Sequence, residues 1–327
     1  MADAPRVEWV LVRVPFRAPF VTAAGAWMAR VSWIVTLRDA DGRCGVGESV
    51  EDDKERVAAL DAARLDLAGF KGARPHPWVG VNATIGAVDV DAGVDAAVRA
   101  VAAGFRTLKL KAGPGEGAAA LAGRLLAVRT AVGEDTALRL DVNGTGTFDE
   151  AVERLRALDA VRLQYVEQPL AMDAVADARR LRGRAGVAIA LDEPVTSPAA
   201  ARALLDAEAA DVLVVKPARV GGPSAVAEIA VEAVRRGVPV VISSMFETGI
   251  GLAAGLASAA ALPDVERWRA ADRDHGLATA DMLEDDLITA PFEVVDGRMR
   301  APGGSGAGAL GVMLDLEAVG RYRVDVA

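Results

Sequence analysis

The chain has 327 residues and a net charge of −9, so a nucleic-acid-binding surface, which would be basic, is not expected. Hydrophobic residues make up 52%, but no uncharged run approaches the roughly 20 residues that a membrane-spanning helix needs. A single cysteine excludes an internal disulfide, and the start lacks the layout of a signal peptide, so we expect a cytoplasmic protein.

The N-terminal part of the chain predicts a small domain of strands followed by one helix. Alternating apolar residues indicate strands over 7–14, 30–38 and 43–49, which would form an antiparallel meander. We expect a loop over residues 18–27 and a helix over residues 51–70. Pro75 and Pro77 mark a natural boundary after this helix.

From Val79 onward, short apolar runs alternate with segments of helical spacing, which is the pattern of βα units around a parallel sheet. We expect an eighth strand at residues 265–270. The Gly-rich, β-like tail after Thr289 is expected to return to the N-terminal meander. The first seven strands should begin near residues 79, 107, 137, 163, 187, 212 and 238, with helices over 91–103, 118–132, 149–158, 174–182, 198–207 and 222–236.

Charged side chains stand at the ends of five consecutive predicted strands. Active sites of parallel barrels lie at the carboxyl ends of the strands, so these side chains should share one site. Strands two and six face each other across an eight-stranded barrel, and both end in a lysine. Lys111 ends the second strand, Asp141 the third, Glu167 the fourth, Asp192 the fifth and Lys216 the sixth.

Three carboxylates that converge on one point repel each other unless a cation lies among them. Oxygen ligands favour Mg²⁺, with Mn²⁺ as a second option, and the two histidines of the chain argue against a His-rich zinc site. A metal ion would stabilise the enediolate that forms when a base removes the α-proton of a carboxylate. A lysine beside a metal ion can serve as that base, because its pKa is lowered towards neutrality.

Five motifs carry a resemblance to the muconate-lactonizing subgroup of the enolase superfamily, and the resemblance covers nearly the whole chain. It implies an α/β fold, a modified TIM barrel of the (β/α)7β type with an α+β capping domain. The capping domain would comprise residues 1–76, joined by the C-terminal segment 290–327, and the barrel residues 77–289. The motifs are Lys-Leu-Lys at 109–111, Asp-Val-Asn at 141–143, Glu-Gln-Pro at 167–169, Asp-Glu at 192–193 and Lys-Pro at 216–217.

The resemblance also implies a role for each of these strand-end residues. Lys111 would remove the α-proton and return it to a departing hydroxyl, while Lys216 would stabilise the planar intermediate as a cation over its ring. Glu193 could replace Asp192 as a metal ligand, although the family pattern favours Asp192. The implied Mg²⁺ ligands are Asp141, Glu167 and Asp192, and Lys109 and Asn143 of the same motifs are assigned to substrate binding.

Two further segments are assigned to the substrate. Ser243 and Ser244 lead into a helix, where hydroxyls and free N–H groups bind anions, although they could equally cap that helix. In related enzymes this region contacts a succinyl carboxylate. The segment 19–27 matches the mobile loop of the family's cap and would cover a ring, with Thr22 as its polar member. His275 lies near the expected barrel mouth and could contact substrate.

The resemblance implies an enzyme that acts on a small-molecule carboxylate, and the sequence shows no sign of an obligate protein partner. The leading expectation is a syn-dehydration that converts a succinylated hydroxycyclohexadiene carboxylate into an aromatic acid. A racemase of N-acylated amino acids or an epimerase of dipeptides is the alternative, because two lysines on opposite faces permit either reaction. A barrel that binds an acid without turnover is disfavoured, since an idle site would carry the desolvation cost of five polar groups.

Overall fold

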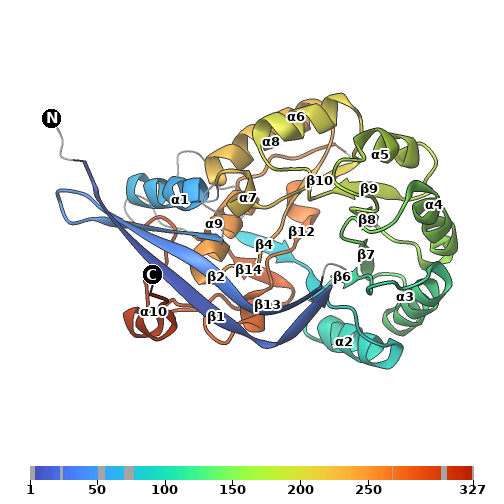
Figure 1. The fold of residues 1–327 in the computed structure, drawn as a ribbon, viewed down its shortest axis with the longest axis horizontal. Coiled ribbons are helices and arrows are strands. Elements are labelled where there is room, and N and C mark those ends of the chain that lie inside the picture. The colour runs from blue at the N-terminus through green and yellow to red at the C-terminus, as the bar shows by residue number, and fades with distance from the viewer. Residues whose placement is uncertain are drawn as a thin grey trace.

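The computed structural model describes residues 4–22, 25–50, 56–69, 77–266, 268–302 and 308–325. A parallel barrel with helices on its outside lies beside an antiparallel sheet, whose long strands run past one side of the barrel (Figure 1). The predicted class, an α/β fold with a modified TIM barrel and an α+β cap, is confirmed. None of the helices in the described part of the chain is long and apolar enough to cross a membrane.

Seven parallel strands form the barrel sheet, in the order β11-β10-β9-β8-β7-β6-β5. The sheet closes through β12 (Asp274–His275), which pairs in parallel with β4 (Trp78–Val81) and continues into a bridge between Gly276 and Ser243. The bounds of the seven strands are β5 Ala83–Ile85, β6 Thr107–Lys111, β7 Ala137–Asp141, β8 Tyr165–Glu167, β9 Ala188–Leu191, β10 Val212–Val215 and β11 Val240–Ile242.

The expected eighth strand at residues 265–270 is wrong. Val265 forms only a local bridge with Trp268, and the strand that closes the barrel is β12. Both residues of β12 are polar and buried: Asp274 accepts a hydrogen bond from the Thr107 hydroxyl at 2.6 Å, and His275 Nδ1 accepts one from the Ile242 N–H at 2.9 Å. A strand whose buried side chains are polar and hydrogen-bonded shows no hydrophobic pattern, so the sequence did not predict where this strand lies.

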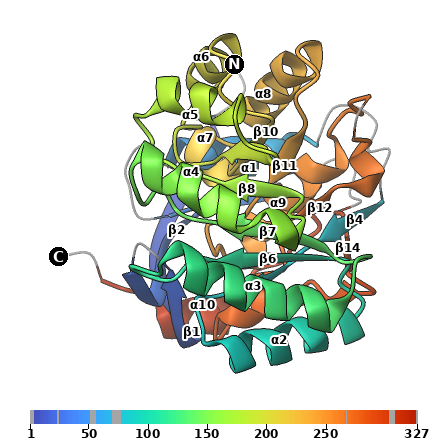
Figure 2. The same ribbon diagram turned by 90° about the vertical axis from the view of Figure 1, so that its right-hand side faces the viewer.

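Helices cover the outer face of the barrel in sequence order, and Figure 2 shows α2 to α5 following one another around it. Local caps begin several of them: Thr147 and Glu150 form a capping box at α4, and the Ser197 hydroxyl accepts the Ala200 N–H at α6. The six predicted helices are confirmed. The bounds are α2 Val90–Ala102, α3 Ala118–Val132, α4 Phe148–Ala157, α5 Val175–Arg182, α6 Pro198–Asp206, α7 Pro217–Val220, α8 Pro223–Arg235 and α9 Gly249–Ala260, with short 3₁₀ turns at Asp159–Val161, Ala270–Asp272 and Ala280–Met282.

The antiparallel sheet contains β1 (Arg6–Thr22), β2 (Gly25–Arg38) and β3 (Cys44–Val50), and α1 (Arg56–Ala68) packs on β3. The expected loop at 18–27 is wrong for the described residues, because β1 and β2 stay paired as far as Thr22 and Gly25. The register shifts between Pro15 and Phe20, and such a bulge bends a strand without ending it. Residues 51–55 and 70 of the expected helix lie outside the described part of the chain.

The C-terminal segment contributes β13 (Val294–Val295), β14 (Arg298–Arg300) and α10 (Leu316–Tyr322). β14 pairs with β4 at the closing side of the barrel, and the end of the chain returns to β1, where the Val324 N–H donates to the Leu11 carbonyl at 2.8 Å. The return to the meander was expected, but a β-like tail was expected where α10 forms. The Asp315 carboxylate caps that helix.

The core lies between the barrel strands and the helices. Side chains alternate across each strand, so Leu108 and Leu110 face the helices while Lys109 and Lys111 face the barrel interior. The same alternation on β7 places its leucines outside and Arg139 and Asp141 inside. The charged groups therefore lie on the opposite faces of strands that buried apolar side chains hold in place. These fully buried leucine and isoleucine side chains are Leu108, Leu110, Leu138, Leu140 and Ile189.

Close approach of β3 and α1 depends on glycine. A Cβ atom added to Gly47 would lie 2.1 Å from the Ala59 carbonyl oxygen, so α1 would have to move off the sheet. Gly47→Ala is expected to lower the free energy of unfolding by about 2 kcal/mol. Gly123→Ala in α3 is the matched control: its Cβ meets nothing within 4 Å and should add about 0.5–1 kcal/mol. Urea denaturation measures both, and a neutral Gly47→Ala would contradict this packing.

Candidate active site

Strand register places the charged side chains at one level of the barrel. Lys111 pairs with Asp141 across β6 and β7, and Asp141 pairs with Glu167 across β7 and β8. Asp192 directly follows β9, and Lys216 directly follows β10. All five side chains therefore stand at the carboxyl ends of neighbouring parallel strands, as the sequence predicted.

Two lysines of β6 hold the carboxylates of the next two strands. The Lys109 Nζ lies 2.9 Å from Asp141 Oδ2 and 2.7 Å from Glu167 Oε1, so it bridges the two acids. The Lys111 Nζ lies 2.6 Å from the same Asp141 oxygen and donates to Asn143 Oδ1 at 3.0 Å. Lys109 thus lies deeper in the barrel than Lys111, and it contacts the acids.

On the other side of the cluster, Asp192 is held by two cations. Its Oδ2 accepts a hydrogen bond from Lys216, and its Oδ1 accepts one from Arg219 at 3.0 Å. Sequence reasoning missed Arg219. The signal was the Pro217 that starts the short helix α7, since one helical turn brings the side chain three residues after Lys216 back to the same carboxylate.

Two residues with a left-handed backbone conformation contact this group of charged side chains. Asn143 (φ 50°) links Lys111 to Glu193, because its Nδ2 donates to Glu193 Oε1 at 3.2 Å. Gln168 (φ 43°) was not singled out from the sequence, and its Oε1 accepts the Asp192 N–H at 3.0 Å. Non-glycine residues rarely adopt this conformation, and such positions gather at functional sites.

The carboxylates differ in electrostatic environment. Burial would raise the pKa of Asp141, but the ammonium groups of Lys109 and Lys111 outweigh it and hold that pKa well below its ordinary value. Burial, together with the charge of Asp141, raises the pKa of Glu167 to about 8. Burial likewise opposes ionisation of Asp192, yet Lys216 and Arg219 lower its pKa. Asp141 and Asp192 are each contacted by two cations, whereas Glu167 is contacted by Lys109 alone, so Glu167 is the acid whose ionisation is opposed most strongly.

This donor set suits a divalent cation bound by oxygen. Among the described residues, Glu167 Oε2 and Glu193 Oε2 are buried oxygens without a hydrogen-bond partner. In the same part of the chain no three acidic, histidine or cysteine side chains enclose a common point, and Lys109 lies between Asp141 and Glu167. An ion bound by these carboxylates would have to replace contacts that the lysines now make.

The segment after β11 differs from the expectation in one respect. The N–H groups at the start of α9 are already used: Thr248 and Gly251 donate to Glu48, and Gly249 donates to the Asp286 carbonyl. Free N–H groups for an anion, expected from the sequence, are therefore not found at these three positions. At Thr248 and Gly251 the reason is the Glu48 carboxylate, which reaches them from β3, about two hundred positions away in the chain.

The hydroxyl of Ser244 is also engaged. It donates to Glu247 Oε2 at 2.7 Å and accepts from the Phe246 N–H at 2.7 Å and the Thr279 hydroxyl at 3.0 Å. Ser243, which directly follows β11, is 6% exposed. The buried His275 accepts a backbone N–H within the barrel wall. Thr22 ends β1, and its side chain lies outside the described part of the structure.

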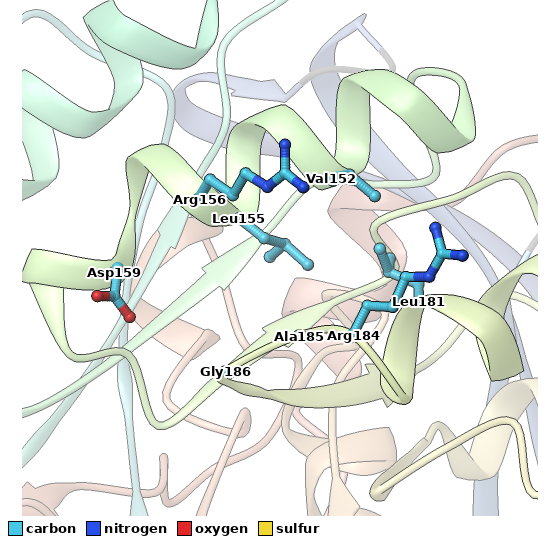
Figure 3. Close-up of a pocket in the computed structure, with 8 residues that line it drawn as sticks. All are labelled: Val152, Leu155, Arg156, Asp159, Leu181, Arg184, Ala185 and Gly186. Carbon is cyan, nitrogen blue, oxygen red and sulfur yellow. The ribbon is translucent and has the colours of Figure 1, made fainter.

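A hollow of about 530 Å³ lies elsewhere, on the outside of the barrel (Figure 3). Its lining comes from α4, α5 and the segments that follow them, with Leu155 and Leu181 between Arg156 and Arg184. None of the strand-end lysines or carboxylates lines it, so it is separate from the site described above.

A closed parallel barrel that gathers lysines and carboxylates at the carboxyl ends of its strands places them where enzymes of this fold have their active sites. The family model described as enolase C-terminal domain-like matches residues 93–318. The chain therefore belongs to this family, within the enolase superfamily.

Two similar curated proteins are both named o-succinylbenzoate synthase. The protein from Thermobifida fusca is 43% identical over 222 residues, which cover 67% of this chain and 65% of that protein. The protein from Mycobacterium bovis is 41% identical over 275 residues, which cover 80% and 78%. The aligned part thus spans just under two thirds of the first relative and more than three quarters of the second.

Solved structures show the same fold. The muconate lactonizing enzyme from Pseudomonas fluorescens superposes with a TM-score of 0.88 at 22% identity, covering 99% of this chain and 100% of that chain. The dipeptide epimerase from Enterococcus faecalis, complexed with Mg and the dipeptide L-Leu-L-Tyr, has a TM-score of 0.83 at 24% identity, covering 95% and 99%.

Proposed function

We propose that the chain is an Mg²⁺-dependent o-succinylbenzoate synthase, a hydro-lyase that dehydrates 2-succinyl-6-hydroxy-2,4-cyclohexadiene-1-carboxylate to 2-succinylbenzoate in menaquinone biosynthesis. The shared name of the curated relatives, at 34–43% identity, is the observation that carries this assignment. The crowded lysines and carboxylates at the barrel mouth support it, because a syn-dehydration of this kind requires a base and charge stabilisation at one point.

Lys111 is proposed as the base that removes the α-proton and then returns it to the departing hydroxyl. Its Nζ is held by Asp141 and Asn143, which fixes the direction from which a proton could be taken. Lys216 is proposed to stand on the opposite face as a cation that stabilises the planar intermediate. Arg219 shares the Asp192 carboxylate with Lys216 and so fixes where that ammonium lies.

Asp141, Glu167 and Asp192 are the proposed Mg²⁺ ligands, with Mn²⁺ as a possible replacement. When bound, the ion would supply electrostatic stabilisation of negative charge on the substrate carboxylate. The unpartnered Glu167 oxygen and the oxygen-rich donor set support this proposal. Glu193 stays an alternative to Asp192, because its Oε2 is also a buried oxygen without a hydrogen-bond partner.

Substrate binding is proposed for Lys109, Asn143, Ser243, Ser244 and Thr22. For Ser244, a direct contact would require its hydroxyl to exchange one of three present partners. We also propose the division into a cap of residues 1–76 and 290–327 and a barrel of residues 77–289. A cytoplasmic location and the lack of nucleic-acid and obligate protein partners stay proposals, which the acidic charge and the single cysteine support.

Racemisation of N-acylated amino acids or epimerisation of dipeptides is the second candidate. One observation favours it: Lys111 and Lys216 end strands that face each other across the barrel, so each could serve one face of a carbon acid. A barrel that only binds an acid is disfavoured, because buried charged groups at this density are costly without a function.

Conversion of the cyclohexadiene carboxylate, followed by absorbance of the aromatic product, tests the assignment. We expect turnover with Mg²⁺, none after EDTA, and recovery when Mg²⁺ is returned. Exchange of the α-proton of an N-succinylamino acid for deuterium, together with loss of optical rotation, measures the second candidate in the same preparation. Rapid racemisation without dehydration would make the second candidate the leading function. If the protein catalysed neither reaction, the result would favour a barrel that only binds an acid.

A further inference from the structure

A carboxylate of the antiparallel sheet reaches the barrel at the start of α9. Glu48 lies on β3 and is 4% exposed. Its Oε1 accepts the Thr248 N–H at 3.1 Å, and its Oε2 accepts the Thr248 hydroxyl at 2.7 Å and the Gly251 N–H at 2.9 Å. Three donors from one helix start are thus held by a side chain from another sheet.

The donors of this contact adjoin the loop that follows β11. Thr248 is the N-cap residue of α9, and Glu247 before it holds the loop through two hydrogen bonds, from the Ser244 hydroxyl and the Met245 N–H, each 2.7 Å. Ser244 in turn accepts the Phe246 N–H. Because these bonds leave residues 244–248 little freedom relative to one another, a side chain that fixes Thr248 also fixes the loop.

The same sheet contacts this loop a second time. Phe246 has a left-handed backbone (φ 64°), and its ring lies against Phe16 and Phe20 of β1 and Trp27 of β2, with ring centroids 5.5, 4.8 and 6.4 Å away. A bulky residue in this conformation persists only when its surroundings hold it. The loop therefore lies between the paired strands β1 and β2 on one side and Glu48 on the other.

Keeping a carboxylate at this position is costly. No lysine or arginine of the described residues forms an ion pair with Glu48, and Glu247 adds a second negative charge nearby. Burial raises the pKa of Glu48 to about 7. A carboxylate nevertheless suits the position, because it offers only acceptors to three converging donors, which an amide does not.

We propose that Glu48 is a positioning residue, which holds the start of α9 so that the loop of residues 243–246 lies where it meets the substrate carboxylate. This inference rests on the proposed function. Glu48 touches neither lysine of the site, so it should act on substrate binding and leave proton transfer by Lys111 largely unchanged.

The test compares Glu48→Gln with Asp66→Asn as a matched control. Asp66 is a buried carboxylate of α1, 2% exposed, which accepts the N–H groups of Val46 and Leu310 at 2.9 and 2.7 Å. Both substitutions turn an NH₂ group towards backbone donors, but only the first does so at α9. We expect Glu48→Gln to raise KM about tenfold and change kcat less than about threefold. Asp66→Asn should lower Tm without moving KM.

Hydrogen–deuterium exchange of the peptide covering residues 243–251 is the second readout, and it needs no substrate. The amides of Thr248 and Gly251 should exchange about tenfold faster or more in Glu48→Gln and at the wild-type rate in Asp66→Asn. If Glu48→Gln fails to fold, Thr248→Val removes only the hydroxyl donor and should raise KM about two- to fivefold.

Equal KM changes in the two carboxylate variants, or unchanged exchange at residues 248 and 251, would overturn the positioning role. An absence of dehydration in the wild-type protein would contradict the proposed function instead, and the exchange comparison would still decide whether Glu48 holds the loop.

Discussion

Replacement of Lys111 by arginine is expected to reduce the dehydration rate by about 10³-fold or more, because a general base is lost. The Lys111 ammonium lies 2.6 Å from Asp141 Oδ2. Arginine keeps a positive charge beside this carboxylate, so the fold should survive. With a pKa above about 12, a guanidinium cannot become a neutral base at working pH. Single-turnover dehydration in saturating Mg²⁺, with circular dichroism as the check on folding, measures the effect.

Lys216→Arg is the matched control, since it makes the same chemical change on the opposite side of the site. If Lys216 contributes only charge, this variant should keep a small measurable dehydration rate. A racemase needs a base on each face, so the same variant should stop racemisation outright. The wider guanidinium could block the ring, but robust turnover by Lys111→Arg would refute the assignment of the base whatever Lys216→Arg does.

Glu167→Gln and Asp141→Asn are each expected to abolish turnover and to weaken Mg²⁺ binding about 100-fold or more, because each removes a charged oxygen ligand. The barrel should still fold. Burial and the neighbouring Asp141 charge raise the pKa of Glu167 to about 8, so a neutral amide there relieves repulsion. Calorimetric titration with Mg²⁺ alone measures the affinity without relying on activity.

Glu193→Gln, compared with Asp192→Asn, tests which of these two neighbouring residues is the third Mg²⁺ ligand. If Asp192 is the ligand, Asp192→Asn should weaken Mg²⁺ binding as strongly as Glu167→Gln, whereas Glu193→Gln should have a smaller effect. The reverse order would move the assignment to Glu193. Full activity after exhaustive EDTA treatment would remove the metal ion from the mechanism altogether.

Local patterns predicted most of the barrel. Leu108 and Leu110 alternate with Lys109 and Lys111, and this alternation alone places the lysines on one face of their strand. Because parallel strands end at one rim, the order of the strands along the chain is enough to place the lysines and acids of successive strand ends together.

Contacts between distant polar groups could not be predicted in this way. Asp274 and His275 form the closing strand through hydrogen bonds to Thr107 and Ile242, and a pattern search for apolar residues passes over them. The long pairing of β1 with β2 up to Thr22 was likewise hidden, because small residues there favour a loop while the strands pair across a bulge.

The sequence by itself determined the order of the barrel strands from the second to the seventh, the helices between them and the residue type at each of these strand ends, because strand alternation and helical spacing are local properties that each segment carries alone. Only the tertiary structure decided which of these groups touch: that Arg219 shares Asp192 with Lys216, and that Glu48 takes up the N–H groups at the start of α9. A hydrogen bond between residues 200 positions apart leaves no period in the sequence, and it forms only when the sheet and the barrel bring its donor and acceptor together.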